Sequence, residues 1–407
     1  MLWDWLLALA GLVLVVVVAR IGGAVATRLR QPRIAGELVA VVFVGPTLLG
    51  GQIAGVVEGA AAAGAVGALF PPTSVDLLAV VGSLGVTLYM LLVGLTIDPL
   101  PMVRRGATIA LLAVAVLAAT AAVALAAAAW LRSDGGWVGP AAGATAFTLA
   151  VGAALAANGV PVVARILEDC GLLRTDTGAV IIAAGAGVTT VALVFAGVAL
   201  EGGHAAAAER FVVVLAGAAV LVAAGNWLSR RHGGALAPGV AVAGLLALAL
   251  GAAVAGRSAL GTALLGPLVV GVAASQAGAP ARVIEERLGR AVRDVLLPVF
   301  LAVAALHTDL RELEPRVLGP VVVILLAATI AKLAAGYGVA RATGFPSGDA
   351  GAVAAALQCG GIVTIAIALD ALAGGLITTR MYAALTLGGL VSTVIAGPLL
   401  ARARPGG

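Results

Sequence analysis

Long apolar runs recur along the whole chain, and short segments that carry most of its charged residues separate them. Each run is about 20 residues long, enough for a helix that rises about 1.5 Å per residue to cross roughly 30 Å of hydrocarbon. Helices are expected because every backbone N–H and C=O group in lipid must be bonded within the structure. We therefore predict an all-α membrane protein with about thirteen transmembrane helices. The predicted spans are residues 3–26, 34–52, 75–97, 107–130, 138–164, 177–200, 211–228, 236–256, 258–277, 295–306, 317–340, 350–369 and 377–400.

The connections between these runs are short, so we expect one membrane domain over residues 1–407 without an inserted soluble domain. The longest polar connection is ARVIEERLGR (281–290), and only Arg257 and Ser258 mark a turn between the eighth and ninth spans. The first run lacks the charged leader and small-residue cleavage site of a signal peptide, so we interpret it as a span.

Composition agrees with the pattern. The chain is 62% hydrophobic and 11% charged, with a mean hydropathy of +1.15. No globule of this size has enough interior to bury so many apolar side chains, so the chain is an integral membrane protein. Its two cysteines and three histidines have no zinc-site, disulfide or nucleophile spacing, and no enzyme activity, metal or cofactor is expected.

The net charge of +5 and the pI of about 10.0 do not indicate a nucleic-acid partner, because the basic residues are distributed by loop. Sixteen of the 24 basic residues fall in alternate connections, six fall in the opposite ones, and Arg20 and Lys332 lie within predicted spans. Basic loops stay in the cytoplasm. We therefore expect a multi-pass protein of the cell membrane with its N-terminus outside and its C-terminus in the cytoplasm.

A short motif occurs twice at a suggestive spacing. VGPTLLGG (44–51) in the second span is matched by LGPLVVGV (265–272) in the ninth. Seven spans separate the copies, so they cross the membrane in opposite directions, as in transporters built from inverted repeats. The repeats would cover approximately residues 34–200 and 258–400. The alternative is a chance match, since Gly and Pro are common in membrane helices.

The same offset pairs the fifth span with the twelfth, and both contain helix-weakening residues. A broken helix is tolerated in lipid only where the freed backbone groups are buried in protein or line a cavity. Such breaks at corresponding places in two repeats point to a substrate site, although kinks that serve packing alone are the other interpretation. The residues are Asn158, Gly159 and Pro161 in one span and Gln358, Gly360 and Gly361 in the other.

Six segments together resemble the monovalent cation:proton antiporter family, in the branch that shares the Na⁺/H⁺ exchanger membrane domain. The resemblance implies an elevator-like or rocking exchanger, usually a homodimer, with two crossed broken helices at its centre. It also implies that an aspartate on the following helix binds the cation and protons alternately, often beside a buried lysine. The segments are RIAGELVAVVFVGPTLLG (33–50), LYMLLVGLTIDP (88–99), NGVPVVARILEDCGLLRTDTG (158–178), LLPVFLAVAALHTDL (296–310), AKLAAGYGVARATGFP (331–346) and GLITTRMYAALTLGGLVSTVIAGPLL (375–400).

The sequence departs from this family where the ion should bind. The position of the aspartate falls on Val188, Thr189 or Thr190, none of which is acidic. The Thr-Ser or Thr-Ala pair usual at the first break falls on Asn158 and the glycine after it, and an arginine common in the twelfth span falls near Gly360. A hydroxyl has no accessible pKa, so the usual carboxylate mechanism is not expected here.

Lys332 is the single lysine of the chain and lies near the middle of the eleventh span, at about the depth of Thr189. A charged side chain at that depth costs roughly 2.5–3.5 kcal/mol on translocon scales. We therefore expect Lys332 to find a counter-charge or to lose its proton, which would make it the proton-carrying group. The alternative is a lysine that snorkels towards the membrane interface.

Other polar residues complete the candidate site. Neutral oxygens that could meet a cation belong to Thr145, Thr148, Asn158, Thr189, Thr190, Gln358 and Thr364, unless the hydroxyls bond their own helices. Glu37, Arg165, Glu168 and Asp169 are candidates for a cytoplasmic cation funnel, against helix capping or a solvated cluster. We interpret Asp370, near the outer end of the twelfth span, as a residue at the membrane interface.

These observations predict a secondary transporter that exchanges Na⁺ or K⁺ for protons through an atypical site. The alternatives are transport of another solute by the same fold and a homologue without transport activity. The predicted partners are monovalent cations, protons, the lipid bilayer and a second copy of the chain.

Overall fold

The described part of the chain is built from helices. The computed structural model describes residues 2–29, 31–42, 72–97, 103–133, 136–200, 238–260, 265–275, 279–300 and 315–402, together with the single positions 213, 217 and 220. Five helical segments in these ranges are long and apolar enough to cross a membrane, so the chain is a multi-pass membrane protein. They are Gly106–Ser133, Ala144–Asp169, Asp176–Leu200, Leu318–Ala342 and Thr379–Arg402.

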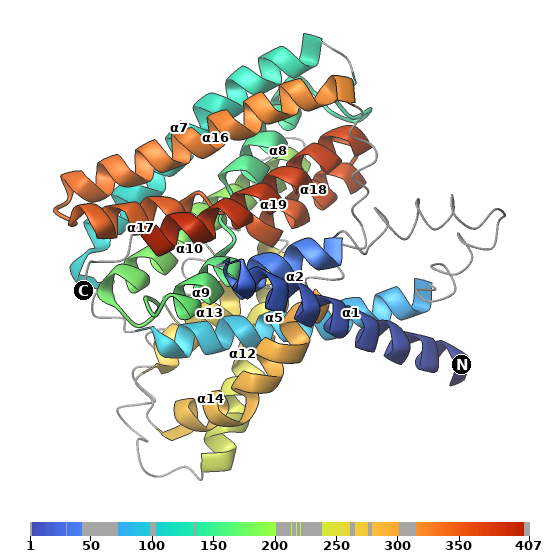
Figure 1. Ribbon diagram of the computed structural model, residues 1–407, viewed down its shortest axis with the longest axis vertical. Coiled ribbons are helices and arrows are strands. Elements are labelled where there is room, and N and C mark those ends of the chain that lie inside the picture. The colour runs from blue at the N-terminus through green and yellow to red at the C-terminus, as the bar shows by residue number, and fades with distance from the viewer. Residues whose placement is uncertain are drawn as a thin grey trace.

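The helices pack as two groups (Figure 1). We call the first the scaffold bundle; it contains α1 (Leu2–Arg28), α2 (Arg33–Val42), α5 (Pro72–Thr96), α12 (Pro238–Leu260), α13 (Leu265–Ala274), α14 (Ala279–Ala291) and the π-helical turn η2 (Val292–Leu296). We call the second the core bundle; it contains α7 (Gly106–Ser133), α8 (Ala144–Ala156), α9 (Val160–Asp169), α10 (Asp176–Leu200), α16 (Pro315–Ala342), α17 (Ser347–Leu357), α18 (Gly361–Ala373) and α19 (Thr379–Arg402).

Most of the packing lies within each bundle. Across the boundary, α9, α10 and α19 of the core bundle meet α2, α5 and α12 of the scaffold bundle. Glycines allow close packing inside the scaffold: a Cβ on Gly94 of α5 would lie 2.7 Å from Cα of Gly271, which belongs to the repeated motif in α13. Since only a glycine fits so close an approach, these positions fix how α5 crosses α13.

Both predicted helix breaks are confirmed. The fifth span is divided into α8 and α9 by residues 157–159, and the twelfth into α17 and α18 by residues 358–360. Pro161 is the second residue of α9, where its missing N–H costs no helical bond. Gly361 has φ +56°, a left-handed conformation that glycine adopts without strain. The break therefore lies where the sequence supplies residues that tolerate it.

One boundary prediction is wrong. Arg257 and Ser258 do not form a turn, because α12 continues through both to Leu260; neither residue removes a backbone hydrogen bond from a helix. The polar connection ARVIEERLGR is itself helical: it forms most of α14, an amphipathic helix that buries Ile284 and continues through η2, where Val292 is also buried. Its high charge density concealed the period of its apolar residues.

Some predictions lie outside the described residues. They are the motif VGPTLLGG (44–51), most of the span predicted at 211–228, and the second half of the span predicted at 295–306.

Candidate functional site

The two helix breaks meet at their backbones. Gly159 N donates a hydrogen bond to Cys359 O at 2.8 Å, which joins the break after α8 to the break after α17. A Cβ on Gly159 would lie 2.8 Å from Gly360 O and 3.0 Å from Cα of Gly361. The crossing therefore requires glycine at position 159, because any side chain there would meet the backbone of the second break.

Asn158 links the two repeats through its side chain. It is buried, with 1% of its surface exposed. Its Nδ2 donates towards three carbonyl oxygens at the end of α17: Ala356 O at 3.0 Å, Leu357 O at 3.2 Å and Cys359 O at 3.2 Å. Its Oδ1 is buried and has no hydrogen-bond partner. The amide thus satisfies the negative end of α17 with a neutral donor.

Thr189 on α10 holds the backbone of the first break. Its Oγ1 accepts a hydrogen bond from Asn158 N at 3.1 Å and donates one to Asn158 O at 2.8 Å. Thr190 instead donates to Ala186 O of its own helix, and Val188 is fully buried. Of the three positions aligned with the family's aspartate, Thr189 is the one whose side chain forms hydrogen bonds at the crossing.

Lys332 reaches the same place from α16. Only 2% of its surface is exposed, and its Nζ donates to Ala157 O at 3.0 Å. Ala157 is the C-cap residue directly after α8, so the ammonium lies at the negative end of that helix dipole. Among the described residues no carboxylate forms an ion pair with Lys332. The snorkelling alternative is wrong, because the side chain ends inside the core bundle.

A cavity of about 140 Å³ adjoins the lysine, between α8, α16, α18 and α19. Its polar side chains are those of Thr329, Lys332, Gln358, Thr364 and Ser392, and its remaining walls are mostly apolar. Gln358 Nε2 donates to Ser392 O at 2.8 Å, while Gln358 Oε1 is buried without a partner. Five predicted site residues thus lie at the crossing or line this cavity beside it: Asn158, Thr189, Gln358, Thr364 and Lys332.

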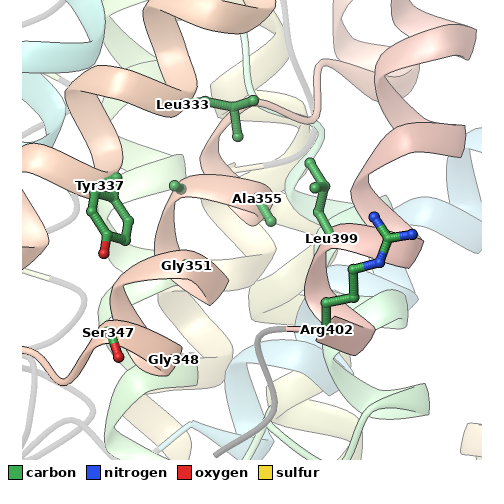
Figure 2. A pocket seen from close by; sticks show the side chains of 9 residues that line it. Leu333, Tyr337, Ser347, Gly348, Gly351, Ala355, Leu399 and Arg402 are labelled. Atoms are coloured by element: carbon green, nitrogen blue, oxygen red, sulfur yellow. The ribbon is translucent and has the colours of Figure 1, made fainter.

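The remaining predicted oxygens lie away from the crossing. Thr148 bonds Ala144 O of its own helix, and Thr145 is exposed. A wider depression of about 500 Å³ lies along α17 before the break, between Tyr337 of α16 and Arg402 of α19 (Figure 2). None of the predicted site residues lines it.

The charged candidates gather where α9 meets the scaffold bundle. Arg165 pairs with Glu168 at 3.1 Å and with Asp169 at 3.8 Å, and Arg293 of η2 pairs with Glu168 at 3.4 Å. Glu37 is buried and pairs with its own helix neighbour Arg33 at 2.8 Å. Whether these residues form a funnel for ions stays a prediction.

Sequence reasoning missed several partners of this cluster and of the crossing. Asp294 of η2 pairs with Arg20 at 3.2 Å, Arg293 of η2 pairs with Glu168 at 3.4 Å, and Ser392 Oγ accepts a hydrogen bond from Gly360 N at 3.0 Å. These three residues are distant in sequence from the residues they meet, and no local pattern indicates them. The hydroxyl of Tyr89 is also buried, and it has no hydrogen-bond partner.

The profile of the family described as "Sodium/hydrogen exchanger, transmembrane" matches residues 13–403. The chain belongs to this family. It is 27% identical to Cation/H(+) antiporter 18 of Arabidopsis thaliana over 376 residues, which cover 89% of this chain and 44% of that protein. It is 29% identical to the Na(+)/H(+) antiporter NhaS4 of Synechocystis over 184 residues, 42% of this chain and 40% of the relative.

The chain thus spans less than half the length of the curated relatives it matches here. Among solved structures it is similar to the sodium proton antiporter MjNhaP1 from Methanocaldococcus jannaschii. The TM-score is 0.64 at 14% identity, and the match covers 98% of this chain and 99% of the other. The chain therefore has the antiporter fold of this exchanger family, with its two crossed broken helices.

Proposed function

We propose that the protein exchanges a monovalent cation for protons across the membrane, with Lys332 in place of the family's carboxylate as the group that carries the proton. The observation that supports this most is the position of Lys332: a buried ammonium that bonds Ala157 O at the crossing and has no ion-pair partner among the described residues. The names of the relatives, cation/H(+) and Na(+)/H(+) antiporters, agree with the proposal.

Repulsion between the protonated lysine and a cation couples cation movement to proton movement. A protonated Lys332 places a positive charge beside the crossing, and a cation there would be repelled in a medium of low dielectric constant. When Lys332 releases its proton, the negative end of α8 is no longer neutralised and a cation is favoured. Proton and cation then occupy the site in turn, which is what exchange requires. The amine replaces a carboxylate because either group changes its charge by one unit when it titrates.

The test is proton flux in vesicles that contain only this protein and a trapped pH dye. Addition of Na⁺, Li⁺ or K⁺ outside should change the internal pH, whereas a large cation such as choline should not. A flux that responds to an added organic solute or anion but to no metal cation would favour transport of another solute. No response to any of them would favour a homologue without transport activity.

Assembly and orientation belong to the same proposal. We infer a homodimer in the cell membrane with the N-terminus outside, as the family resemblance and the distribution of basic residues indicate. Exposed apolar residues recur every four positions on α1, at Val13, Val17, Ile21 and Val25, and give the scaffold bundle a face suited to lipid or to a second copy.

A further inference from the structure

The cavity beside Lys332 opens sideways between two helices that are long and apolar enough to cross the membrane, α16 and α19. Val322 and Leu326 of α16 and Val391 of α19 line the cavity, and all three side chains are exposed at the surface of the protein. Exposed apolar side chains on such helices face the acyl chains of the bilayer. The cavity can therefore be reached from the hydrocarbon of the membrane.

The buried end of this cavity carries a positive charge without a counter-charge. Lys332 lines it and has 2% of its surface exposed. Its ammonium has three hydrogens, and the structure gives one of them a partner, Ala157 O at 3.0 Å. Within the described ranges no carboxylate pairs with it. Because a buried charge is costly unless it is paired, an anion in the cavity would stabilise this ammonium.

The walls of the cavity determine which kind of anion fits. They are largely apolar, with Leu155, Ala328 and Leu385 among the lining residues. A phosphate or a sulfate would place its further charged oxygens against these walls, which is unfavourable. A carboxylate has a single charge and two oxygens, and it can stand at the end of an apolar chain. The volume of about 140 Å³ equals that of about four or five water molecules, enough for a carboxylate and the first carbons of such a chain.

We propose that this cavity binds the carboxylate of a long-chain fatty acid that enters from the bilayer, and that a carboxylate oxygen accepts a hydrogen bond from Nζ of Lys332. The chain leaves between α16 and α19, past Leu326 and Val391, and lies along the exposed apolar face of α16. Val323 and Ile330 extend that face. The site goes beyond the proposed cation exchange and does not rest on it, because binding requires neither an ion gradient nor transport.

Photo-crosslinking of the purified protein in phosphatidylcholine nanodiscs tests the site. The probe is palmitic acid that carries a diazirine in its chain, and mass spectrometry of the peptides locates the labelled residues. Wild type should show saturable labelling on α16 and α19 around Leu326 and Val391. Excess palmitate should suppress this labelling, whereas methyl palmitate should not, because it has the same chain without the charge.

Two charge-removing variants separate the proposed ion pair from general attraction to a basic protein. Lys332→Gln should weaken the labelling around Leu326 and Val391 about tenfold or more, because a charge-assisted hydrogen bond is lost. Arg402→Gln is the matched control. It removes a positive charge at the end of α19, beside the wider depression and away from this cavity, and should leave the labelling unchanged (Figure 2).

Equal labelling of wild type and Lys332→Gln would overturn the proposal, because the apolar chain alone would then account for binding. An equal loss in Lys332→Gln and Arg402→Gln would overturn it as well. If Lys332→Gln does not fold, the competition on wild type decides: methyl palmitate that competes as well as palmitate, or labelling that avoids α16 and α19, contradicts the site. The proposed exchange fails separately, when vesicles show no cation-dependent proton flux.

Discussion

Thr189→Val tests whether the hydroxyl at the family's acidic position has become a structural link. Valine has nearly the shape of threonine, so the change leaves no large cavity and removes only the hydroxyl. Asn158 N loses the acceptor that Thr189 Oγ1 provides at 3.1 Å. Asn158 O loses the hydroxyl donor but keeps Val160 N at 2.9 Å. The substitution thus leaves one buried N–H group without a partner.

The expected magnitude follows from that single group. An unpaired buried donor costs about 1–3 kcal/mol, and the weakened carbonyl adds about 1 kcal/mol or less. Thr190→Val is the matched control, one residue along the same helix. Its hydroxyl bonds Ala186 O, a carbonyl in the middle of the α10 ladder, so its loss should cost no more than about 0.5 kcal/mol.

Unfolding by SDS in mixed detergent micelles measures both variants against wild type. We expect Thr189→Val to lower the free energy of unfolding by about 1–3 kcal/mol more than Thr190→Val does. Equal effects of the two substitutions would refute the assignment of Thr189 as the residue that holds the helix break.

Two further predictions concern the site and the topology. Thr189→Asp should create or strengthen cation-dependent proton flux, because it places a carboxylate at the crossing that Lys332 also reaches. Val188→Asp and Thr190→Asp test the neighbouring positions. If all three variants fold and none gains flux, the site differs from the family's by more than one residue, and transport of another solute is favoured. The topology is tested with single cysteines at positions 231 and 290, introduced after Cys170 and Cys359 are replaced. They should not react with an impermeant thiol reagent added outside intact cells, because both positions lie in loops predicted to be cytoplasmic. Strong labelling at either position would reverse the proposed orientation.

The sequence predicts the helix breaks well because their causes are local. Gly159, Pro161 and Gly360 disfavour a helix that continues unbroken through them, so the two divided spans could be located before any contact was known. Lys332 could be singled out in the same way, since a lone lysine within an apolar run is costly and conspicuous. Fold and candidate site follow from these residues together with the family resemblance.

The contacts that make the site were not predictable from local pattern. Asn158 meets Thr189 across 31 residues and Ala356 across 198, and neither distance leaves a periodic signal. Thr189 and Thr190 point in different directions from their helix, but which of them faces the crossing depends on how α10 packs, and the sequence alone does not give that packing. In α14, charged residues concealed a helix whose apolar face packs inwards.

Proton flux by Lys332→Arg and Lys332→Gln vesicles, measured across a range of pH, tests the central claim most directly. If Lys332 carries the proton, glutamine abolishes coupled flux because it cannot titrate, and arginine abolishes it because it cannot release its proton. Both variants should fold, as judged by their elution from size-exclusion chromatography. Normal transport by Lys332→Arg with an unchanged pH profile would contradict the account, because the lysine would then serve only as a fixed positive charge at Ala157 O.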